Sequence, residues 1–542
     1  MGWTNDGLAH RPVVMGTRGL VASAHPLASV AGLRMLMNGG NAVDAAVAVA
    51  AALNVCEPYM SGMGGLGYML VYTARDRTLR VLDYIGRSPY AAVREAFSTP
   101  EEKEVGPKSP LVPGAVGGWL TALEEHGRLD RATVFAPAIE YAEQGVPITL
   151  QNEIFFRAAA PRLTAEARAT FLPGGTVPVP GTILKQPLLG ASFREIVAEG
   201  KDAFYRGRIG ERIIGAVTGQ GGLLSERDLA DFRPEWQSTV STAYRGYEIH
   251  TAPPPCSGFQ YLQTFNLLEP FDLQSMGQNS ADTIHVMAEA MKLATADRIA
   301  YAAQPDAPVA ELLSPMYADR RRALIDPRRA LVSEGERFGS PRGGETVAAG
   351  LGGNASRECT THFDVIDGDG NAVSVTQSIG AFFGSGVMAG DTGIMLNNFS
   401  YWFDLDPASP NVIGPHKKVE MCMAPAMLFR DSRLFLAIGT PGSFGILETT
   451  PQMISNVIDH GFSVQAAIEA PRFRTYEGTR LEIEGRVPET IRAELVRRGH
   501  DVQVIDDWSP VVGGGQGIMI DPDSRALLGG ADPRRDGYAL AW

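Results

Sequence analysis

One stretch of the chain constrains the fold most: residues 358–378 read ECTTHFDVIDGDGNAVSVTQS. Two runs of alternating, largely β-branched residues, FDVID and AVSVTQS, flank the polar segment DGDGN, which favours a tight turn. The pattern predicts a β-hairpin, and two adjacent threonines, Thr360 and Thr361, stand at its start. Threonine favours strands in any case. These two residues therefore either simply begin the strand or carry chemistry of their own.

The turn segment offers a third interpretation, because Asp-x-Asp-x-Asn is also how an EF-hand calcium loop begins. The twelfth residue of such a loop is a glutamate. Counted from Asp367, the twelfth residue here is Ser378, and no helical pattern flanks the loop. The spacing therefore argues against calcium.

The chain changes character just before the hairpin. Residues 334–358 read EGERFGSPRGGETVAAGLGGNASRE, which is rich in glycine with scattered charges. This composition is typical of an exposed, flexible connecting segment, here predicted over about 334–359. The segment runs directly into the threonine pair, where a cut would make a threonine the first residue of a new chain.

The remaining patterns predict one layered α+β domain. Residues 26–38 and 42–57 read as two helices; glycines end the first, and Asn41 caps the second, which is apolar on nearly every side and hence predicted to be buried. The middle third is mostly helical by pattern, with one short strand, YRGYEIHTA. Beyond the hairpin the chain is rich in strands, interrupted by a helical stretch over residues 449–470. Strands at both ends with helices between them favour a single domain.

Charge and motifs exclude several functional classes. The net charge is −13, and no cluster of lysines and arginines forms a phosphate-binding stripe, so nucleic acid is not an expected partner. Four cysteines without CxxC spacing and nine scattered histidines predict neither a metal site nor a disulfide framework. Without HExxH, GxSxG or a GxGxxG after a strand, no cofactor is expected. The lack of a signal-peptide or membrane-helix run predicts a cytoplasmic location.

The threonine pair therefore remains as the chemical feature of the chain. A threonine hydroxyl is a weak nucleophile unless a base removes its proton. When threonine is the first residue of a chain, its own α-amino group, with an ordinary pKa of ~7.7–8.0, can serve as that base. No histidine or aspartate partner is then required. An internal threonine must first be released by breaking the preceding peptide bond.

Many segments, in order along nearly the whole chain, resemble γ-glutamyltranspeptidases, the N-terminal-nucleophile hydrolases that cut themselves before a Thr-Thr-His-aromatic motif. The resemblance rests on NGGNAVDAAVAVAAALNVCEPYMSGMGGLGYML, VPGAVGGW, FYRGRIGERI, GGLLSERDLADF, YRGYEIHTAPPPCSG and DPRRDGYA. The most specific segment is TTHFDVIDGDGNAVSVTQSIGAFFGSGVMAGDTGIMLNN.

The resemblance implies a four-layer αββα sandwich and a precursor cut between Cys359 and Thr360. A large chain of residues 1–359 and a small chain of residues 360–542 would stay associated as one structural domain. Thr360 would be the nucleophile, with its hydroxyl oriented by Ser378. Backbone N–H groups of Gly442 and Ser443, in the turn GTPGSFG, would stabilise the oxyanion; an ordinary strand exit is the alternative for this turn. Water or an amine would take the acyl group.

The chain departs from the family at the residues that grip the γ-glutamyl group. The family has an arginine four residues before a proline, but DYIGRSP places Ile85 there and Arg87 two residues later. The acidic residue that holds the α-amino group corresponds to Trp402 in NNFSYWF. Phe399 stands where an amide or acid would help, and Asp404 is close in sequence.

A serine pair of the family that touches the α-carboxylate corresponds here to Met421 and Cys422. Because a buried charged ligand without partners loses several kcal/mol of affinity, these changes predict a less polar, aromatic or bulkier acyl group. The aromatic residues near Trp402 fit core packing equally well.

The sequence thus predicts a self-processing amide hydrolase or acyltransferase with an altered acyl donor. One alternative is a true γ-glutamyl enzyme acting on glutathione-like compounds, with Arg87 and Asp404 as replacement anchors. Another is an uncleaved, non-catalytic binding or scaffold protein. The expected partners are a small-molecule amide, an acceptor and the other half of the cleaved chain, with further oligomers open.

Overall fold

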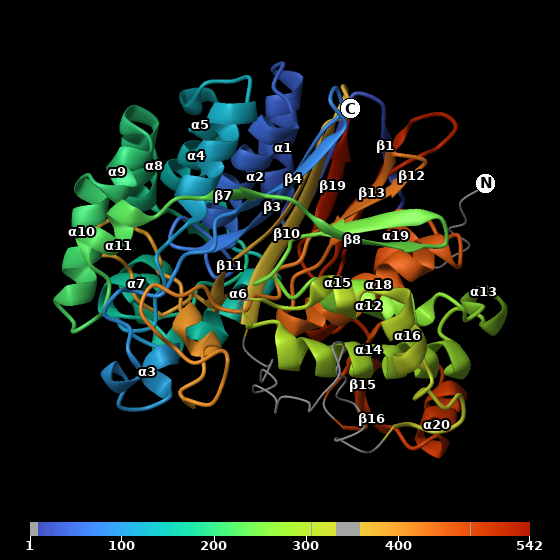
Figure 1. The fold of residues 1–542 in the computed structure, drawn as a ribbon. Coiled ribbons are helices and arrows are strands. Elements are labelled where there is room, and N and C mark those ends of the chain that lie inside the picture. Colours follow the sequence, from blue (N-terminus) through green and yellow to red (C-terminus); the bar gives the residue numbers. More distant parts are fainter. Residues whose placement is uncertain (1–8, 305, 332–357, 477) are drawn as a thin grey trace.

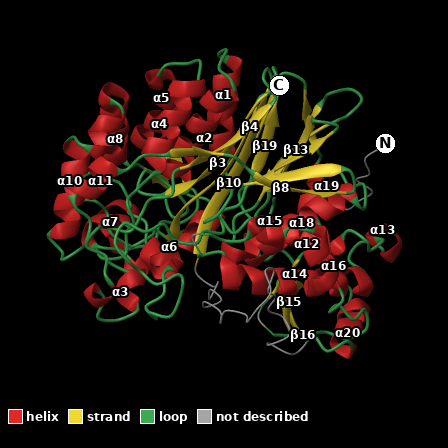
Figure 2. Ribbon diagram, viewed as in Figure 1, coloured by secondary structure: helices red, strands yellow, loops and turns green. Residues whose placement is uncertain are grey.

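Two antiparallel seven-stranded sheets lie face to face at the centre of the protein, and helices cover the outer face of each (Figures 1 and 2). The computed structural model describes residues 9–304, 306–331, 358–476 and 478–542. This arrangement is the predicted four-layer αββα sandwich, built from one α+β domain. The predicted connecting segment, residues 334–359, lies outside the described residues except for its last two, which begin strand β10.

Both central sheets combine strands from distant parts of the sequence. The first contains, in spatial order, β1 (Val14–Gly16), β18 (Leu527–Ala531), β17 (Gln516–Ile520), β13 (Arg433–Gly439), β12 (Ala426–Arg430), β9 (Tyr247–Thr251) and β8 (Val240–Tyr244). The second contains β19 (Tyr538–Ala541), β2 (Gly19–Ser23), β10 (Glu358–Asp367), β11 (Ala372–Ala381), β3 (Leu66–Thr73), β4 (Thr78–Asp83) and β7 (Glu235–Gln237).

The helix layer on the second sheet is formed by α1 (Pro26–Met37), α2 (Ala42–Cys56), α4 (Ala115–His126), α5 (Arg131–Gln144) and α8 (Pro187–Glu199). Every residue of α2 is buried, as its apolar sequence predicts. Its start is fixed by a capping box, in which the Asn41 side chain accepts from the N–H of Asp44 and the Asp44 carboxylate accepts from the N–H of Asn41. The predicted cap is therefore confirmed.

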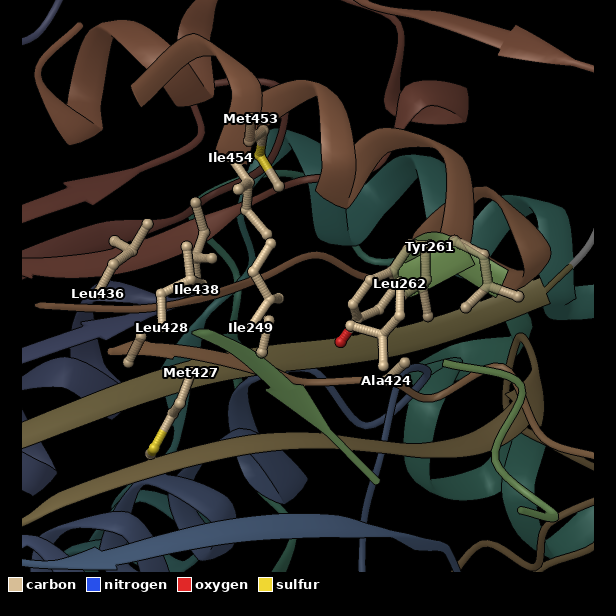
Figure 3. Packing of buried hydrophobic residues seen from close by; sticks show 14 of the residues in the cluster. Ile249, Tyr261, Leu262, Ala424, Met427, Leu428, Leu436, Ile438, Met453 and Ile454 are labelled. Carbon is tan, nitrogen blue, oxygen red and sulfur yellow. The ribbon is translucent and has the colours of Figure 1, made fainter. Parts of the chain in front are cut away.

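The layer on the first sheet is formed by α12 (Phe259–Leu268), α14 (Ala281–Tyr301), α18 (Ile446–Ile458) and α19 (Val464–Glu469). Figure 3 shows side chains of α12 and α18 meeting those of β9, β12 and β13 in a buried apolar cluster. Labelled members are Ile249, Tyr261, Leu262, Leu428, Leu436, Ile438, Met453 and Ile454. Burial of such side chains is the main contribution to the stability of a packed layer.

Smaller elements surround this core. They are α3 (Glu101–Glu104), α6 (Leu150–Ala159), α7 (Ala165–Phe171), α9 (Lys201–Tyr205), α10 (Arg208–Thr218), α11 (Glu226–Asp231), α13 (Leu273–Met276), α15 (Val309–Leu312), α16 (Pro315–Arg322), α20 (Glu489–Arg497), a three-stranded sheet of β14 (Phe473–Thr475), β15 (Arg480–Glu484) and β16 (Asp501–Ile505), and a pair, β5 (Val146–Pro147) and β6 (Ile183–Leu184). Of the described helices, none has both the length and the apolar character needed to cross a membrane.

Two sequence predictions need correction. The segment YRGYEIHTA is not one strand, because Arg245 and Gly246 have φ angles of 50° and 81° and turn the chain from β8 into β9. The helical stretch predicted over residues 449–470 is two helices, α18 and α19, which Gly461, with a φ of 67°, separates. In both cases a glycine in the left-handed region lies in the connection between the two elements.

Candidate active site

Thr360 lies at a break in the regular pairing of β10 with β11. Cys359 pairs with Gly380 and Thr361 pairs with Gln377, so Thr360 alone faces two residues of β11. This is a β-bulge, a device that redirects side chains and peptide groups near active sites. Gly380 has a φ of 96°, and a Cβ there would lie 2.0 Å from Oδ1 of Asn398, so the bulge requires glycine at this position.

Ser378, on the bulged part of β11, contacts the peptide bond that precedes Thr360. Its hydroxyl donates a hydrogen bond to the carbonyl oxygen of Cys359 and accepts one, at 2.8 Å, from the N–H of Gly380. The second bond orients the hydroxyl so that its proton points at the carbonyl. A donor in this position draws electron density from the carbonyl carbon, which favours attack by a nucleophile.

Groups from two distant segments contact the threonine pair, one at Thr360 and one at Thr361. Nη1 of Arg535 donates to the carbonyl oxygen of Thr360 at 3.1 Å. The hydroxyl of Thr361 donates to Oε2 of Glu57, which follows α2, at 3.1 Å. Burial raises the pKa of Glu57 to about 8, against the opposing charge of Arg535. Thr360 itself is only 4% exposed.

The turn GTPGSFG lies beside β10, between β13 and α18. Gly442 and Ser443 have φ angles of 135° and 57°, and for Ser443 this is an uncommon, strained conformation. Within the described residues, neither backbone N–H has a hydrogen-bond partner. Two free N–H groups in a held turn are what an oxyanion site requires.

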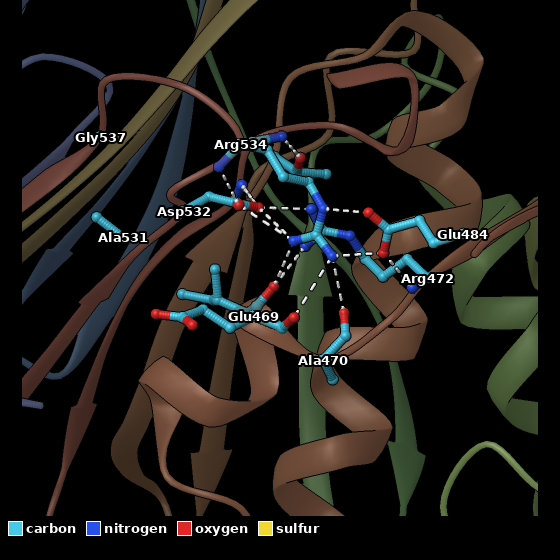
Figure 4. Close-up of polar contacts among 12 residues, drawn as sticks. Glu469, Ala470, Arg472, Glu484, Ala531, Asp532, Arg534 and Gly537 are labelled. Carbon is cyan, nitrogen blue, oxygen red and sulfur yellow. Dashed lines mark hydrogen bonds and ion pairs between the residues drawn. The ribbon is translucent and has the colours of Figure 1, made fainter. Parts of the chain in front are cut away.

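The loop of residues 513–515 packs against this turn at Gly442, and a buried charge network fixes the loop (Figure 4). Arg472 and Arg534 both form ion pairs with Asp532, and Arg534 also pairs with Glu484 at 2.6 Å. Burial alone would raise the pKa of Asp532, but Arg534 and Arg472 hold it at about 2. The Asp532 carboxylate in turn accepts from the N–H of Gly515 at 3.0 Å, which fixes the loop.

Three residues at the predicted acyl site are buried in the apolar core. Ile85, Met421 and Cys422 are at most 2% exposed and belong to the same cluster as the first sheet. Met421 is also held by its backbone, since its N–H donates to Pro255 O at 2.9 Å. No charged atom is offered by these three side chains.

The aromatic residues differ from one another. Phe399 is buried in the core cluster, as core packing predicts. Trp402 is half-buried, and its ring lies 4.8 Å from that of Phe444, the residue that follows Ser443 in the turn. Trp402 Nε1 is buried and unpartnered among the described residues. Trp402 thus connects the predicted acyl site to the turn.

The two predicted replacement anchors each contact other groups. Arg87 is half-exposed and pairs with Glu235 at 3.4 Å. The Asp404 carboxylate accepts a hydrogen bond from Ser409 within its own loop. Both charges therefore have partners other than a substrate.

Several residues near the site were not predicted from sequence. Arg298 of α14 pairs with Glu420 at 2.6 Å, and its guanidinium lies 3.9 Å from the centre of the Phe444 ring. No local motif marks this contact, because the two charged residues are 122 positions apart. Arg535 belongs to the quoted motif DPRRDGYA, so the resemblance could have indicated it.

The fold also brings together scattered groups that sequence spacing kept apart. His285, Glu289 and His500 offer ligand atoms within 4.8 Å of one another. His285 and His500 share a hydrogen bond of 2.8 Å, and burial lowers the pKa of His500 to about 3. Glu289 is paired with Lys292 at 2.6 Å. The contacts are those of a neutral histidine pair beside an internal ion pair.

Comparison with known proteins places this geometry in context. The family model described as Gamma-glutamyltranspeptidase matches residues 28–542. The chain is 40% identical to the Acylase ACY 1 proenzyme of Pseudomonas sp. (strain SE83), over 99% of this chain and 96% of that protein. It is 34% identical to the Glutathione hydrolase proenzyme of Escherichia coli (strain K12), over 96% of this chain and 91% of that protein. The solved structure of a cephalosporin acylase from Bacillus halodurans has a TM-score of 0.90 at 35% identity, covering 98% of this chain and 97% of that one.

Proposed function

Since the chain belongs to the gamma-glutamyltranspeptidase family, we propose that Thr360 is the nucleophile of this self-processing amide hydrolase or acyltransferase. The observation that carries the proposal is the hydrogen bond from Ser378 to the Cys359 carbonyl, directly before Thr360. The relatives' names, which include proenzymes, support processing.

Self-cleavage would proceed within the bulge. Thr360 Oγ1 attacks the carbonyl carbon of Cys359, whose oxygen is stabilised by the hydroxyl of Ser378. The C–N bond breaks, its nitrogen takes a proton and becomes the α-amino group of Thr360, and an ester links Cys359 to Thr360. Water then opens the ester, which leaves a carboxylate on Cys359 and a free hydroxyl on Thr360.

The cut would divide the protein into residues 1–359 and 360–542 without dividing the fold. Both central sheets contain strands from each part; for example, β2 of the first part lies between β19 and β10 of the second. These ladders support the proposal that the two chains remain one structural domain.

In the mature enzyme the α-amino group of Thr360 would accept the hydroxyl proton as Oγ1 attacks the substrate amide. The N–H groups of Gly442 and Ser443, which lack other partners in the described structure, would stabilise the oxyanion. The leaving amine takes the proton, and water or a second amine then removes the acyl group. Ser378 would remain in place to orient the nucleophile.

The proposed acyl donor lacks the α-amino charge of a γ-glutamyl group. The positions that would pair with that zwitterion hold Ile85, Trp402, Met421 and Cys422, and the first and last two are buried among apolar side chains. The likeness to acylases, including a cephalosporin acylase, supports a different acyl group. A glutaryl group avoids the unpaired α-ammonium but keeps a carboxylate, whereas an aromatic acyl group leaves neither charge unpaired.

A glutathione hydrolase is the second candidate, because relatives with that name also match nearly the whole chain. It would need Arg87 and Asp404 to turn toward the substrate. Arg87 already pairs with Glu235 and Asp404 with Ser409, which argues against the glutathione hydrolase. The non-catalytic scaffold has no comparable support.

Two matched substrates test the proposal. Glutaryl p-nitroanilide and γ-glutamyl p-nitroanilide share the leaving group and differ only by the α-amino group. The purified, cleaved protein should hydrolyse the first faster. The Thr360→Ala variant, which should neither be cleaved nor hydrolyse either anilide, is the control for contaminating activity.

A further inference from the structure

Arg535 is a buried guanidinium without an ion-pair partner within the described residues, although it lies beside the candidate nucleophile. Arg535 is 6% exposed, and its Nη1 donates to the carbonyl oxygen of Thr360 at 3.1 Å. The same nitrogen lies 3.6 Å from Sδ of Met60, and Nε is buried and unpartnered in the described structure. Buried charges are as a rule paired. An unpaired one at this position therefore needs an explanation.

The position of Arg535 is set by its neighbours. The preceding residue, Arg534, points into the charge network with Asp532 and Glu484 (Figure 4). Arg535 runs along the loop at Gly514, where an added Cβ would lie 2.7 Å from Arg535 Cδ. The absence of a side chain at Gly514 is thus what lets the guanidinium reach Thr360.

We infer that Arg535 keeps the α-amino group of mature Thr360 uncharged, so that this amine can take the hydroxyl proton. This inference rests on the proposed function, in which Thr360 becomes the first residue. The α-nitrogen and the carbonyl oxygen belong to the same residue, so bond lengths keep Nη1 of Arg535 within roughly 6–7 Å of the amine. A like charge at this distance disfavours the ammonium form.

The amine needs this help because the reaction uses only its free-base form. As Oγ1 forms a bond to the acyl carbon, its proton moves to the α-nitrogen. The acyl C–N bond then breaks, and the ammonium returns the proton to the leaving nitrogen. An amine that is already protonated can start neither step.

One carboxyl group near the threonine pair could cancel the charge of Arg535. Oε2 of Glu57 accepts a hydrogen bond from the hydroxyl of Thr361 at 3.1 Å. Burial raises the pKa of Glu57 to about 8, so at neutral pH this carboxyl is mostly uncharged. The positive charge of Arg535 therefore acts on the amine in the pH range where the amine must lose its proton.

Other titratable groups face the same region. The Asp536 carboxylate accepts from the hydroxyl of Thr149 at 2.5 Å, and burial raises the pKa of Asp536. Burial also raises the pKa of Tyr59 well above its usual range, so its phenol is neutral. Cleavage adds a carboxylate at Cys359. Because this new group is common to all cleaved variants, it does not distinguish them.

Replacing the charge tests the inference. In the cleaved protein, Arg535→Gln should move the acid limb of the pH profile of kcat/KM upward by about one to two pH units. Arg535→Lys keeps the charge and should stay near the wild-type limb. Glu57→Gln should leave the limb in place below pH 7. A second readout is the pKa of the small chain's terminal amine, followed by NMR after reductive methylation with 13C-formaldehyde.

Either of two results with Arg535→Gln would overturn the inference. The first is an acid limb and amine pKa in Arg535→Gln equal to those of the wild type. The second is an unmoved limb with a raised KM for acyl groups that carry a carboxylate, which would make Arg535 a substrate anchor. If Arg535→Gln is not cleaved, Gly514→Ala, which displaces the guanidinium, should show the upward shift, and its absence would overturn the inference. Failure of the proposed function would look different from failure of this inference, because the wild-type protein would then stay uncleaved.

Discussion

The hydroxyl of Ser378 donates a hydrogen bond to the carbonyl oxygen of Cys359, on the peptide bond that precedes Thr360. The bulge in β11 makes this contact possible, because in regular pairing a side chain would stand away from the neighbouring backbone. In the proposed cut this hydroxyl would stabilise the oxyanion, while the N–H of Gly380 holds the hydroxyl in place. The rate of maturation should depend on this bond.

Removing the hydroxyl should slow self-cleavage. We expect Ser378→Ala to cleave about 10²–10³-fold more slowly, the usual effect of losing one oxyanion donor. Ser378→Thr retains a hydroxyl and should cleave at close to the wild-type rate. The measurement is a time course of precursor and products on denaturing gels. Equal rates in Ser378→Ala and the wild type would contradict this role.

The site of the cut follows from the nucleophile. Wild-type protein should give two chains, the smaller with 542 − 359 = 183 residues and threonine at its amino terminus. Thr360→Ala should remain a single chain, whereas Thr361→Ser keeps the bond to Glu57 and should still be cut. Intact mass and terminal sequencing settle the outcome. A terminus at Thr361 would show that the second threonine is the nucleophile.

The thiol next to the cut should not be needed. In the proposed cut Cys359 would contribute only its carbonyl, and its side chain is buried among apolar residues. Cys359→Ala should therefore be cleaved and retain activity. Treatment of the mature enzyme with a thiol-blocking reagent provides the companion measurement. Loss of turnover on blocking would instead indicate a cysteine nucleophile.

The preference for one acyl donor over another should change when charged residues are introduced at positions 402 and 85. One unmet ionic contact costs ~1.5–3 kcal/mol, so kcat/KM for γ-glutamyl p-nitroanilide should be about 10- to 100-fold below that for the glutaryl compound. Trp402→Asp with Ile85→Arg should shift the preference toward γ-glutamyl. Trp402→Asn with Ile85→Arg controls for size. Efficient glutathione hydrolysis that is lost in Arg87→Ala would favour the glutathione hydrolase.

Folding stability should fall in acid through Asp532. Its pKa is about 2 in the folded protein against 3.8 ordinarily, so the carboxylate stabilises the fold above about pH 4. This contribution, on the order of 2 kcal/mol, is lost as pH falls through about 2. Urea unfolding of Thr360→Ala, a single chain, should show it, and Asp532→Asn in that background should flatten the decline. A decline equally steep in both proteins would assign it to other carboxyls.

Local patterns predicted the elements that depend on local chemistry. The hairpin around DGDGN forms because Asp367 accepts hydrogen bonds from the backbone of Asp369 and Asn371, and Asn41 caps α2 as expected. The turn at Arg245 was missed because an arginine in the left-handed region gives no sequence signal, although Gly246 follows it.

The site was predictable only where its parts are close in sequence or belong to the family motif. Thr360 and Ser378 share one hairpin, so the bond from Ser378 to the carbonyl before Thr360 follows from its pairing. Glu57 and Arg535 reach the same point from opposite ends of the chain, through the stacking of layers. The pairing of Arg298 with Glu420 likewise depends on how α14 packs, which no local pattern encodes.

Each central sheet contains strands from both sides of the proposed cut, and this determines how the two products of the cut would behave. Residues 1–359 alone lack β11 and nearly all of β10, and residues 360–542 alone lack β2, β3 and β9, so neither product contains a complete central sheet. Separation would expose unpaired edges and apolar faces, and is equivalent to unfolding. Dilution should therefore not inactivate the mature enzyme, and mixing the two chains after separate synthesis should require that they fold together.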